Sequence, residues 1–300
     1  MKLLIAGATG LIGTALVEEC LTLGFSINYL TTRKSKIENK QNYQGYYWNP
    51  SEGIIDRDAF KGVTTIINLA GAPVAKRWTT SYKNEILNSR KDAAIVIFNA
   101  LKGINHTVTH YISASGISIY ASSIDFLYDE NFNEKADTFL GNVVMEWEAA
   151  ADLFTQLSIE VTKVRTGIVL SNNGGALQQM SKPIKMGFGA CLGSGEQWQS
   201  WIHIDDMVGI YLYLLKNELS GVYNAVSPSP VSNKKMTQLL AQHFNKNIWL
   251  PNVPKFVLRI LLGEMAAIAF ESQLVSSQKI LKEGYLFQYV NLENALEDLL

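Results

Sequence analysis

Short apolar runs and helical stretches alternate along the first half of the chain, beginning with KLLIA at 2–6. A short run of this kind is typical of a strand that is buried in a parallel sheet. From Leu11 to Leu23 the apolar positions recur at helical spacing, and Gly24 then provides a helix stop. The pattern predicts a strand, a glycine-containing turn and a helix within the first 24 residues.

The same alternation continues as far as residue 165. Further strands are predicted at 26–32, 63–70, 108–115 and 159–165, and helices beginning after Thr79 or Thr80 and running from about 138 to 154. Strands separated by helices indicate βαβ units, so we predict an α/β fold with a Rossmann-type, doubly wound parallel sheet. The crossovers of such units are right-handed, so the loops that follow the strands share one edge of the sheet.

The second half of the chain has a less regular pattern. Helices are predicted at 205–216, 233–245, 253–262 and 291–299, and short strands near 222–226 and 285–290. Glycine and aromatic residues are frequent at 187–201, and no linker rich in proline or serine interrupts the chain. We predict a Rossmann domain at 1–170, with segments around 200–228 returning to its sheet, and a smaller substrate-side region at 171–300.

Composition and charge narrow the classes of function. The chain has 300 residues and a net charge of −1, which argues against a nucleic-acid-binding protein. Its two cysteines and four histidines show no ligand or disulfide spacing, so we expect no metal and a reducing, cytoplasmic compartment. The apolar stretch 256–270 contains Arg259 and Glu264 and is shorter than the about 20 residues of a membrane span. We therefore expect a small-molecule partner rather than nucleic acid or a membrane.

Three glycines follow the first strand at a spacing of three residues. In a dinucleotide site the first permits a tight turn, the second lets the backbone approach the pyrophosphate, and the third packs the helix on the strand. Free N–H groups at the helix start would then face the phosphates. The alternative is a tight turn without a ligand. The predicted cofactor contacts here are Gly7, Thr9, Gly10, Leu11, Ile12 and Gly13.

The end of the second strand predicts which dinucleotide is bound. An NAD site needs an acid there to bind the ribose hydroxyls, whereas this chain has Thr31, Thr32, Arg33 and Lys34. An arginine can bind a 2′-phosphate through two hydrogen bonds. We predict NADP(H) in preference to NAD(H), with Thr32 and Arg33 among its contacts. The alternative is that these cations are solvated surface charges.

Several motifs resemble those of the extended or atypical short-chain dehydrogenase/reductases. They are GATGLIG at the start, NLAGAP (68–73), ISASGISIY (112–120), RTGIVL (165–170), WIHIDD (201–206) and NAVSP (224–228). More narrowly, the chain resembles the bacterial epimerase family proteins, which are often labelled NAD-dependent epimerase/dehydratase or nucleoside-diphosphate-sugar epimerase. SRK (89–91) and MEWEAAA (145–151) add to this resemblance, and LLGE (261–264) and EGYLFQY (283–289) resemble the group's own C-terminal segment, at about 248–297 here.

The resemblance implies a Rossmann fold with a dinucleotide site. It implies that Leu69, Ala70 and Gly71 line the adenosine and ribose. It also implies that Arg165 and Gly167 lie beside the nicotinamide. The resemblance does not imply a particular reaction, because most of the group has no assigned substrate.

The usual proton donor of this superfamily is missing. Its reductases carry a Tyr-x-x-x-Lys pair, in which the lysine tunes the tyrosine to protonate the new alkoxide. Aligned on WEAAA, the tyrosine position falls at Phe139 or Leu140 and the lysine position at Val143 or Val144. None of these side chains can donate a proton.

Other side chains are candidates for the chemistry. Ser115 falls at the superfamily's catalytic serine position and Tyr120 follows it, and we predict that these two act in catalysis. Their alternatives are a serine bonded to backbone and a tyrosine that only packs. Trp201 and His203 are predicted on the substrate side, while Asp205 is a good helix N-cap.

Two glutamates lie on the helix predicted from about 138 to 154. Glu146 and Glu148 flank Trp147 on a helix, and we expect one of them to pair with a basic residue.

The chain is either an NADP(H)-dependent oxidoreductase or epimerase acting on a small substrate, or a catalytically silent NADP(H)-binding redox sensor. The missing pair favours the sensor. The segment 187–201 and WIHIDD favour the enzyme, because a sensor needs no elaborate substrate wall. We favour the enzyme.

Overall fold

A parallel sheet forms the centre of the protein in the computed structural model, which describes residues 1–300. Its strands are β1 (Lys2–Ala6), β2 (Ser26–Thr31), β3 (Asn39–Lys40), β4 (Tyr43–Asn49), β5 (Ile54–Ile55), β6 (Thr65–Asn68), β7 (His110–Gly116), β9 (Glu160–Thr166) and β13 (Gly221–Ala225). They are ordered β13-β9-β7-β6-β1-β2-β4-β3, with β5 beside β4. All pairs are parallel except those that β3 and β5 make with β4. The predicted α/β fold with a doubly wound parallel sheet is confirmed.

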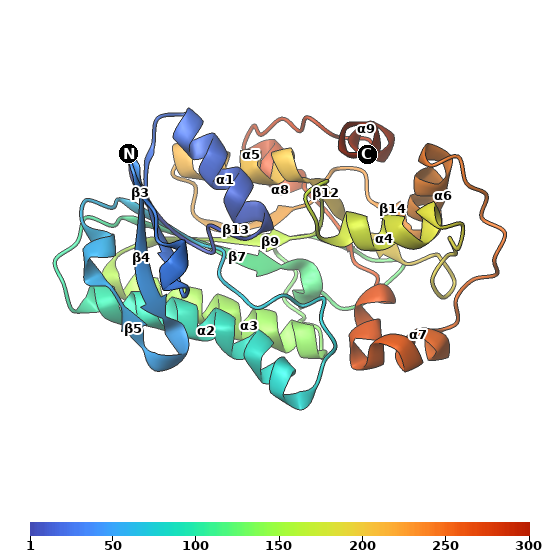
Figure 1. The fold of residues 1–300 in the computed structure, drawn as a ribbon, viewed down its shortest axis with the longest axis horizontal. Helices are drawn as coiled ribbons and strands as arrows, with labels where there is room; N and C mark the ends of the chain where they lie inside the picture. The colour runs from blue at the N-terminus through green and yellow to red at the C-terminus, as the bar shows by residue number, and fades with distance from the viewer.

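Helices cover both faces of this sheet. α1 (Leu11–Thr22) and α5 (Ile204–Lys216) lie on one face, and α2 (Thr80–Lys102) and α3 (Phe139–Asp152) lie on the other (Figure 1). Successive side chains of a strand point to opposite faces, so β1 supplies both cores. Leu3 and Ile5 belong to the core beneath α1 and α5, and Leu4 and Ala6 belong to the core beneath α2 and α3.

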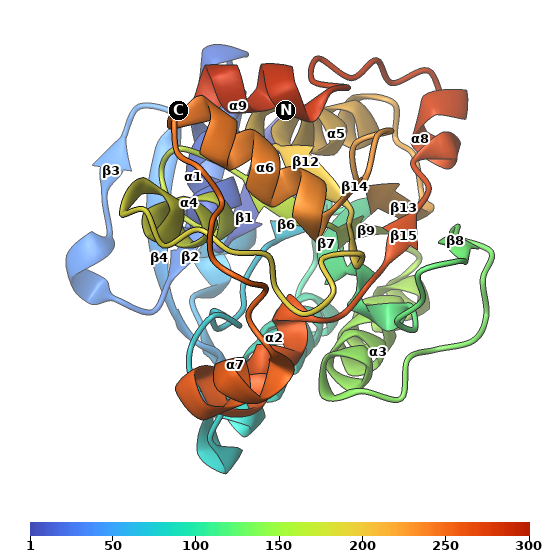
Figure 2. The same ribbon diagram turned by 90° about the vertical axis from the view of Figure 1, so that its right-hand side faces the viewer.

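The second half of the chain gathers at the end of the sheet toward which the β7 arrow points (Figure 1). Figure 2, viewed from that end, shows α4, α6 and α7 in front of the strand ends. Besides α5, the helices of this half are α4 (Ala176–Lys185), α6 (Asn233–His243), α7 (Lys255–Leu262), α8 (Gln278–Lys282) and α9 (Leu292–Leu299), with a 3₁₀ helix, η6 (Gly263–Ala269), after α7. Its small sheets pair β10 (Ile168–Leu170) with β12 (Trp201–His203), β11 (Trp198–Gln199) with β14 (Val231–Ser232), and β15 (Leu274–Val275) with β8 (Leu127–Tyr128).

The strand predicted at 285–290 is wrong, because a buried carboxylate binds this backbone instead of a neighbouring strand. Asp206 is fully buried, and its carboxylate accepts the backbone N–H of Gln288 at 2.8 Å and of Tyr289 at 2.9 Å. The Tyr285 hydroxyl donates to the same carboxylate at 2.9 Å. The alternation of aromatic residues here therefore reflects packing against α5. The prediction that Asp205 is the N-cap of this helix is also wrong. His203 caps α5, since its Nδ1 accepts a hydrogen bond from the Asp205 N–H.

None of the helices combines the length and the apolar character that crossing a membrane requires.

Candidate functional site

The glycine loop after β1 is fixed by close backbone packing. Gly7 has a φ of 82°, which favours glycine. A Cβ atom on Gly7 would lie 2.7 Å from the Leu69 carbonyl carbon, and one on Gly13 would lie 2.1 Å from the Gly7 oxygen. These contacts seat α1 on the turn and place the end of β6 against it.

Gly10, in contrast, faces outward with room beside it. A Cβ atom here would have only the Gly7 oxygen nearby, at 3.3 Å. Gly10 is the N-cap of α1 and no side chain caps the helix, so the first N–H groups, those of Leu11, Ile12 and Gly13, are left for another acceptor. Thr9 and Gly10 are exposed. The loop therefore fits a pyrophosphate lying over the helix N-terminus.

The loop after β2 presents cations without a nearby acid. The Arg33 backbone N–H donates to the Thr31 hydroxyl at 3.2 Å, which turns the chain outward at the strand end. The side chains of Thr32 and Arg33 are exposed. The next acid along the chain, Glu38, pairs with Lys40 at 2.5 Å. An exposed, uncompensated guanidinium at this position fits a 2′-phosphate.

A half-buried arginine of the SRK motif, Arg90, supports the loop after β6. The Arg90 guanidinium donates to the carbonyl oxygens of Ala72 at 3.1 Å and Ile86 at 2.9 Å. It also lies over the Trp147 ring. A Cβ atom on Gly71 would lie 3.0 Å from the Arg90 Cζ, so glycine allows this approach. Arg90 thereby fixes Leu69, Ala70 and Gly71, and their adenosine-contacting role stays a prediction.

Three polar residues form a row across adjacent strands beside the predicted nicotinamide position. In the sheet register Ser115 of β7 is opposite Arg165 of β9, and Arg165 is opposite Asn224 of β13. Arg165 binds both carboxylate oxygens of Glu148 on α3, at 2.8 and 3.0 Å. The Ser115 hydroxyl donates to Glu148 Oε1 at 2.6 Å.

Tyr120 completes this buried network. Its hydroxyl accepts from Arg165 at 2.9 Å and donates to the Asn224 side chain at 2.8 Å. Ser115, Tyr120, Arg165 and Glu148 are all buried. The structure thus brings together three of the predicted site residues. Glu148 was not predicted as a site residue; the only signal for it was the expectation that one acid beside Trp147 pairs with a basic residue.

The ion pair fixes the charge of this network. Burial by itself raises the pKa of Glu148, but the hydrogen bonds and charge of Arg165 lower it below its ordinary value. Burial raises the pKa of Tyr120. Glu148 is therefore an ionised carboxylate at neutral pH, and Tyr120 keeps its proton. The second flanking acid, Glu146, pairs with Lys91 at 2.8 Å, so both acids pair where one was expected.

A pocket of about 670 Å³ opens beside the start of α3. Phe139 and Leu140, at the position of the missing tyrosine, line it. The opposite wall comes from α7, η6 and the residues that follow them. The charged side chains lining this pocket are Lys255, Arg259, Glu264 and Glu271.

Trp201 and His203 do not line this pocket, so the structure gives no support to their predicted substrate-side role. Trp201 is fully buried and its indole donates to the Ser229 carbonyl at 2.9 Å. His203 stacks on Tyr289 with ring centroids 3.7 Å apart. Both rings pack within the small region instead of facing open space.

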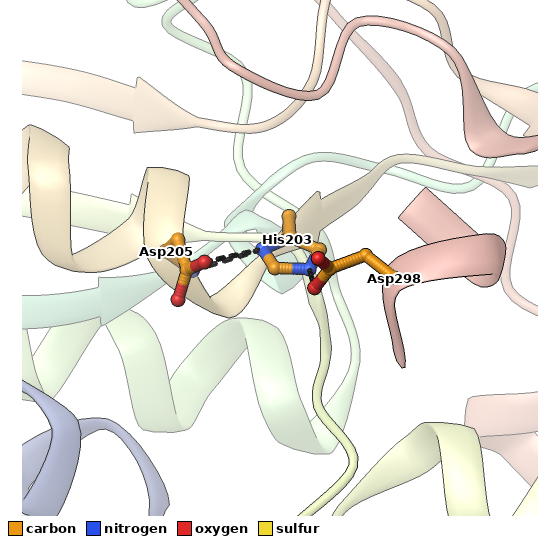
Figure 3. Close-up of side chains that lie close together, drawn as sticks. All are labelled: His203, Asp205 and Asp298. Atoms are coloured by element: carbon orange, nitrogen blue, oxygen red, sulfur yellow. Dashed lines mark hydrogen bonds and ion pairs between the residues drawn. The ribbon is translucent and has the colours of Figure 1, made fainter. Parts of the chain in front are cut away.

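His203 lies between two aspartates (Figure 3). Its Nδ1 is 3.7 Å from an Asp205 carboxylate oxygen, and its Nε2 is 3.2 Å from an Asp298 oxygen. The two carboxylates approach opposite edges of the ring, so each lies beside a different ring nitrogen. Burial lowers the pKa of His203. A neutral imidazole here links β12 and α5 to α9.

Two further glycines bear on the cofactor side. A Cβ atom on Gly167 would lie 2.3 Å from the Ser200 oxygen, so this glycine allows the chain to pack on β12, and its cofactor role stays a prediction. A Cβ atom on Gly175 would lie 3.0 Å from the Leu11 side chain. The loop before α4 therefore lies against the end of the glycine loop, a contact that was not predicted from the sequence.

Comparison with known proteins links the two halves of the chain to one group. The model of the NAD dependent epimerase/dehydratase family matches residues 3–142. A domain of unknown function, DUF1731, matches residues 253–299. An epimerase family protein of Staphylococcus aureus (strain MRSA252) is 36% identical over 300 residues, which cover 99% of this chain and 98% of the relative.

Solved structures of epimerases and epimerase family proteins are similar to the chain over its whole length. The human epimerase family protein SDR39U1 (isoform 2), crystallised with NADPH, is 28% identical with a TM-score of 0.84, covering 100% of this chain and 99% of that one. A nucleoside-diphosphate sugar epimerase from Corynebacterium glutamicum is 27% identical with a TM-score of 0.79. The match covers 100% of this chain but only 58% of the Corynebacterium chain.

Proposed function

The chain belongs to the NAD-dependent epimerase/dehydratase family, as an epimerase family protein, and from this we propose that it is an NADP(H)-dependent oxidoreductase or epimerase of the extended or atypical short-chain type. Its substrate is a small molecule, and the reaction proceeds without a Tyr-x-x-x-Lys pair. The observation that carries the proposal is the pocket lined by Leu140, because it lies where the superfamily's tyrosine would meet a substrate.

The residues around the glycine loop fit a dinucleotide. Gly10 with the first turn of α1 would hold the pyrophosphate, and Thr32 with Arg33 would hold the adenosine phosphate. When bound, the dinucleotide supplies or accepts a hydride. The human relative crystallised with NADPH supports the preference for NADP(H).

Ser115 and Tyr120 have different roles in this proposal. Ser115 ends β7 on the nicotinamide side, and because its hydroxyl already donates to Glu148, it would accept a hydrogen bond from a hydroxyl group of the substrate. Both sides of the Tyr120 hydroxyl are already bound, by Arg165 and Asn224. We therefore assign Tyr120 a positioning role: it holds Arg165, which holds Glu148 and through it Ser115.

The substitution Arg33→Ala is expected to weaken NADPH binding by about 10- to 100-fold and to leave NADH binding nearly unchanged. The loss corresponds to about 1.4–2.8 kcal/mol, as expected for a charge-assisted contact to a phosphate. Fluorescence titration of both cofactors measures it. Lys36→Ala is the matched control, since Lys36 is an exposed cation in the same segment. Equal affinity of the unmutated protein for NADPH and NADH would contradict the cofactor assignment.

The redox-sensor function is the second candidate, favoured by the apolar side chains of Leu140 and Val144 at the Tyr and Lys positions. Incubation with NADPH or NADP⁺ and a panel of aldehydes, ketones and sugar nucleotides separates the two. The enzyme should convert at least one compound to a reduced, oxidised or epimerised product, seen by proton NMR. Firm NADPH binding without any product would favour the sensor.

A further inference from the structure

We propose that Glu271 is the catalytic residue that gives and takes the proton in this pocket, in place of the absent tyrosine. The inference rests on the proposed function and adds a residue to it. Glu271 lies far along the chain from the α3 positions where the superfamily carries its donor. Its side chain nevertheless lines the same pocket as Phe139 and Leu140. A substrate filling this pocket would meet both walls.

Backbone hydrogen bonds attach the Glu271 segment to the loop that follows β7. The Ser272 N–H donates to the Ser122 hydroxyl at 2.9 Å, and the Ser123 N–H donates to the Ser272 carbonyl at 2.8 Å. Gln273 also lies within 3.5 Å of the Tyr120 carbonyl. These bonds tie the backbone next to Glu271 to the loop that follows Ser115 in the chain.

The surroundings of Glu271 raise the pKa of its carboxyl group. Its carboxyl group has one side-chain partner, the Gln273 amide at 3.3 Å. Burial raises the pKa of Glu271, and the Gln273 hydrogen bond only partly opposes this. Glu148, in contrast, is paired with Arg165 and its pKa is lowered. When surroundings separate the pKa values of two carboxyl groups in this way, the one with the raised pKa is suited to proton transfer and the other remains ionised.

The other charged groups facing this pocket do not neutralise Glu271. Glu264 is held by Lys83 at 2.8 Å. Lys255 lies over the Phe270 ring, 5.5 Å from its centroid. Arg259 is one turn further along α7 and lines the same pocket. Neither cation forms an ion pair with Glu271, and neither opposes the rise in its pKa.

In the direction of reduction, Glu271 gives its proton to the substrate. The O–H bond of the Glu271 carboxyl breaks and a new O–H bond forms at the substrate's carbonyl oxygen. A bound, reduced nicotinamide dinucleotide would supply the hydride for the carbonyl carbon, so that the carbonyl would be reduced to an alcohol and the dinucleotide oxidised. Glu271 is left as a carboxylate and regains a proton from water. In the direction of oxidation the same carboxylate accepts the hydroxyl proton.

Titration of the carboxyl group tests the first half of the proposal without a substrate. Burial also raises the pKa of Glu130. Besides the Glu130 signal, carbon-13 NMR of glutamate carboxyls should show a signal titrating above 4.5 that is absent in Glu271→Gln and retained in Glu196→Gln, an exposed acid outside the pocket. Since a raised pKa in the folded state stabilises the protein only while the group is protonated, unmutated protein should lose stability relative to Glu271→Gln as the pH rises through that value. A Glu271 signal titrating at or below 4.5 would overturn the proposal.

Measurements of turnover test the second half of the proposal, the transfer of the Glu271 proton during catalysis. On any compound that the unmutated protein converts, Glu271→Gln should lower kcat by about 100- to 10,000-fold, with unchanged NADPH affinity. Glu271→Asp should recover part of the rate and Glu196→Gln all of it. Turnover that survives in Glu271→Gln would overturn the donor role alone. If the unmutated protein binds NADPH but converts no compound, the proposed function and the donor role both fail.

Discussion

Replacing Glu148 by alanine is expected to destabilise the protein by about 3–5 kcal/mol, the cost of breaking a buried ion pair from one side. Arg165 would keep its charge in a buried site without a carboxylate, and the Ser115 hydroxyl would lose its acceptor. Urea unfolding at neutral pH, followed by circular dichroism, measures the change in the free energy of unfolding.

Glu146→Ala is the control for this measurement. Glu146 lies two residues away and pairs with Lys91 on the surface, where such a pair contributes about 0–1 kcal/mol. The pKa of Glu148 is lowered in the folded state, so its stabilisation is present above its unfolded value and is lost as the pH falls through the folded value. The difference between the two variants should therefore shrink in acid. Equal stability of both variants at neutral pH would contradict this view of the network.

The substitution Gly10→Val is expected to abolish dinucleotide binding while the fold survives. Gly10 has a φ of −84° and a ψ of 177°, which any residue can adopt, so the backbone is not strained by a side chain. The added branch would instead occupy the surface over the first turn of α1, where the phosphates would lie. NADPH affinity should fall by at least about 100-fold, a loss of about 2.8 kcal/mol or more.

Gly103→Ala is the matched control for Gly10→Val. Gly103 ends α2 with a φ of −98°, and a Cβ atom there would come no closer than 3.6 Å to another group. This variant should bind NADPH like the unmutated protein. If Gly10→Val keeps a native circular dichroism spectrum and binds NADPH within a factor of about three, well under 1.4 kcal/mol, the glycine loop is not the phosphate site.

Most of the fold could be predicted from the sequence, because its strands are apolar runs buried on both faces. Such runs are unambiguous at β1, β6 and β7. The segment YQGYYWN gave no such signal, yet it forms β4 beside β2. Its residues are mostly half-buried and many are aromatic, and no α-helix separates it from β2, so neither periodicity nor the βαβ pattern indicated it.

The site was predictable only where neighbouring strands bring residues together. Ser115 and Arg165 end adjacent parallel strands, so their proximity follows from the fold. Glu148 reaches them from the buried face of α3, where a glutamate is unusual and its partner cannot be identified from spacing. Glu271 follows an irregular segment after α7 and has no sequence pattern of its own. Its position depends on hydrogen bonds to Ser122 and Ser123, which only the structure shows.

A crystal structure of the protein with NADPH is the most direct test of the central claim, that the cofactor and the pocket form one active site. We expect the pyrophosphate over Gly10 and the 2′-phosphate at Arg33. The nicotinamide ring should lie beside Ser115 and face the pocket lined by Leu140 and Glu271. A nicotinamide turned away from this pocket, or NADPH bound elsewhere on the protein, would contradict the account.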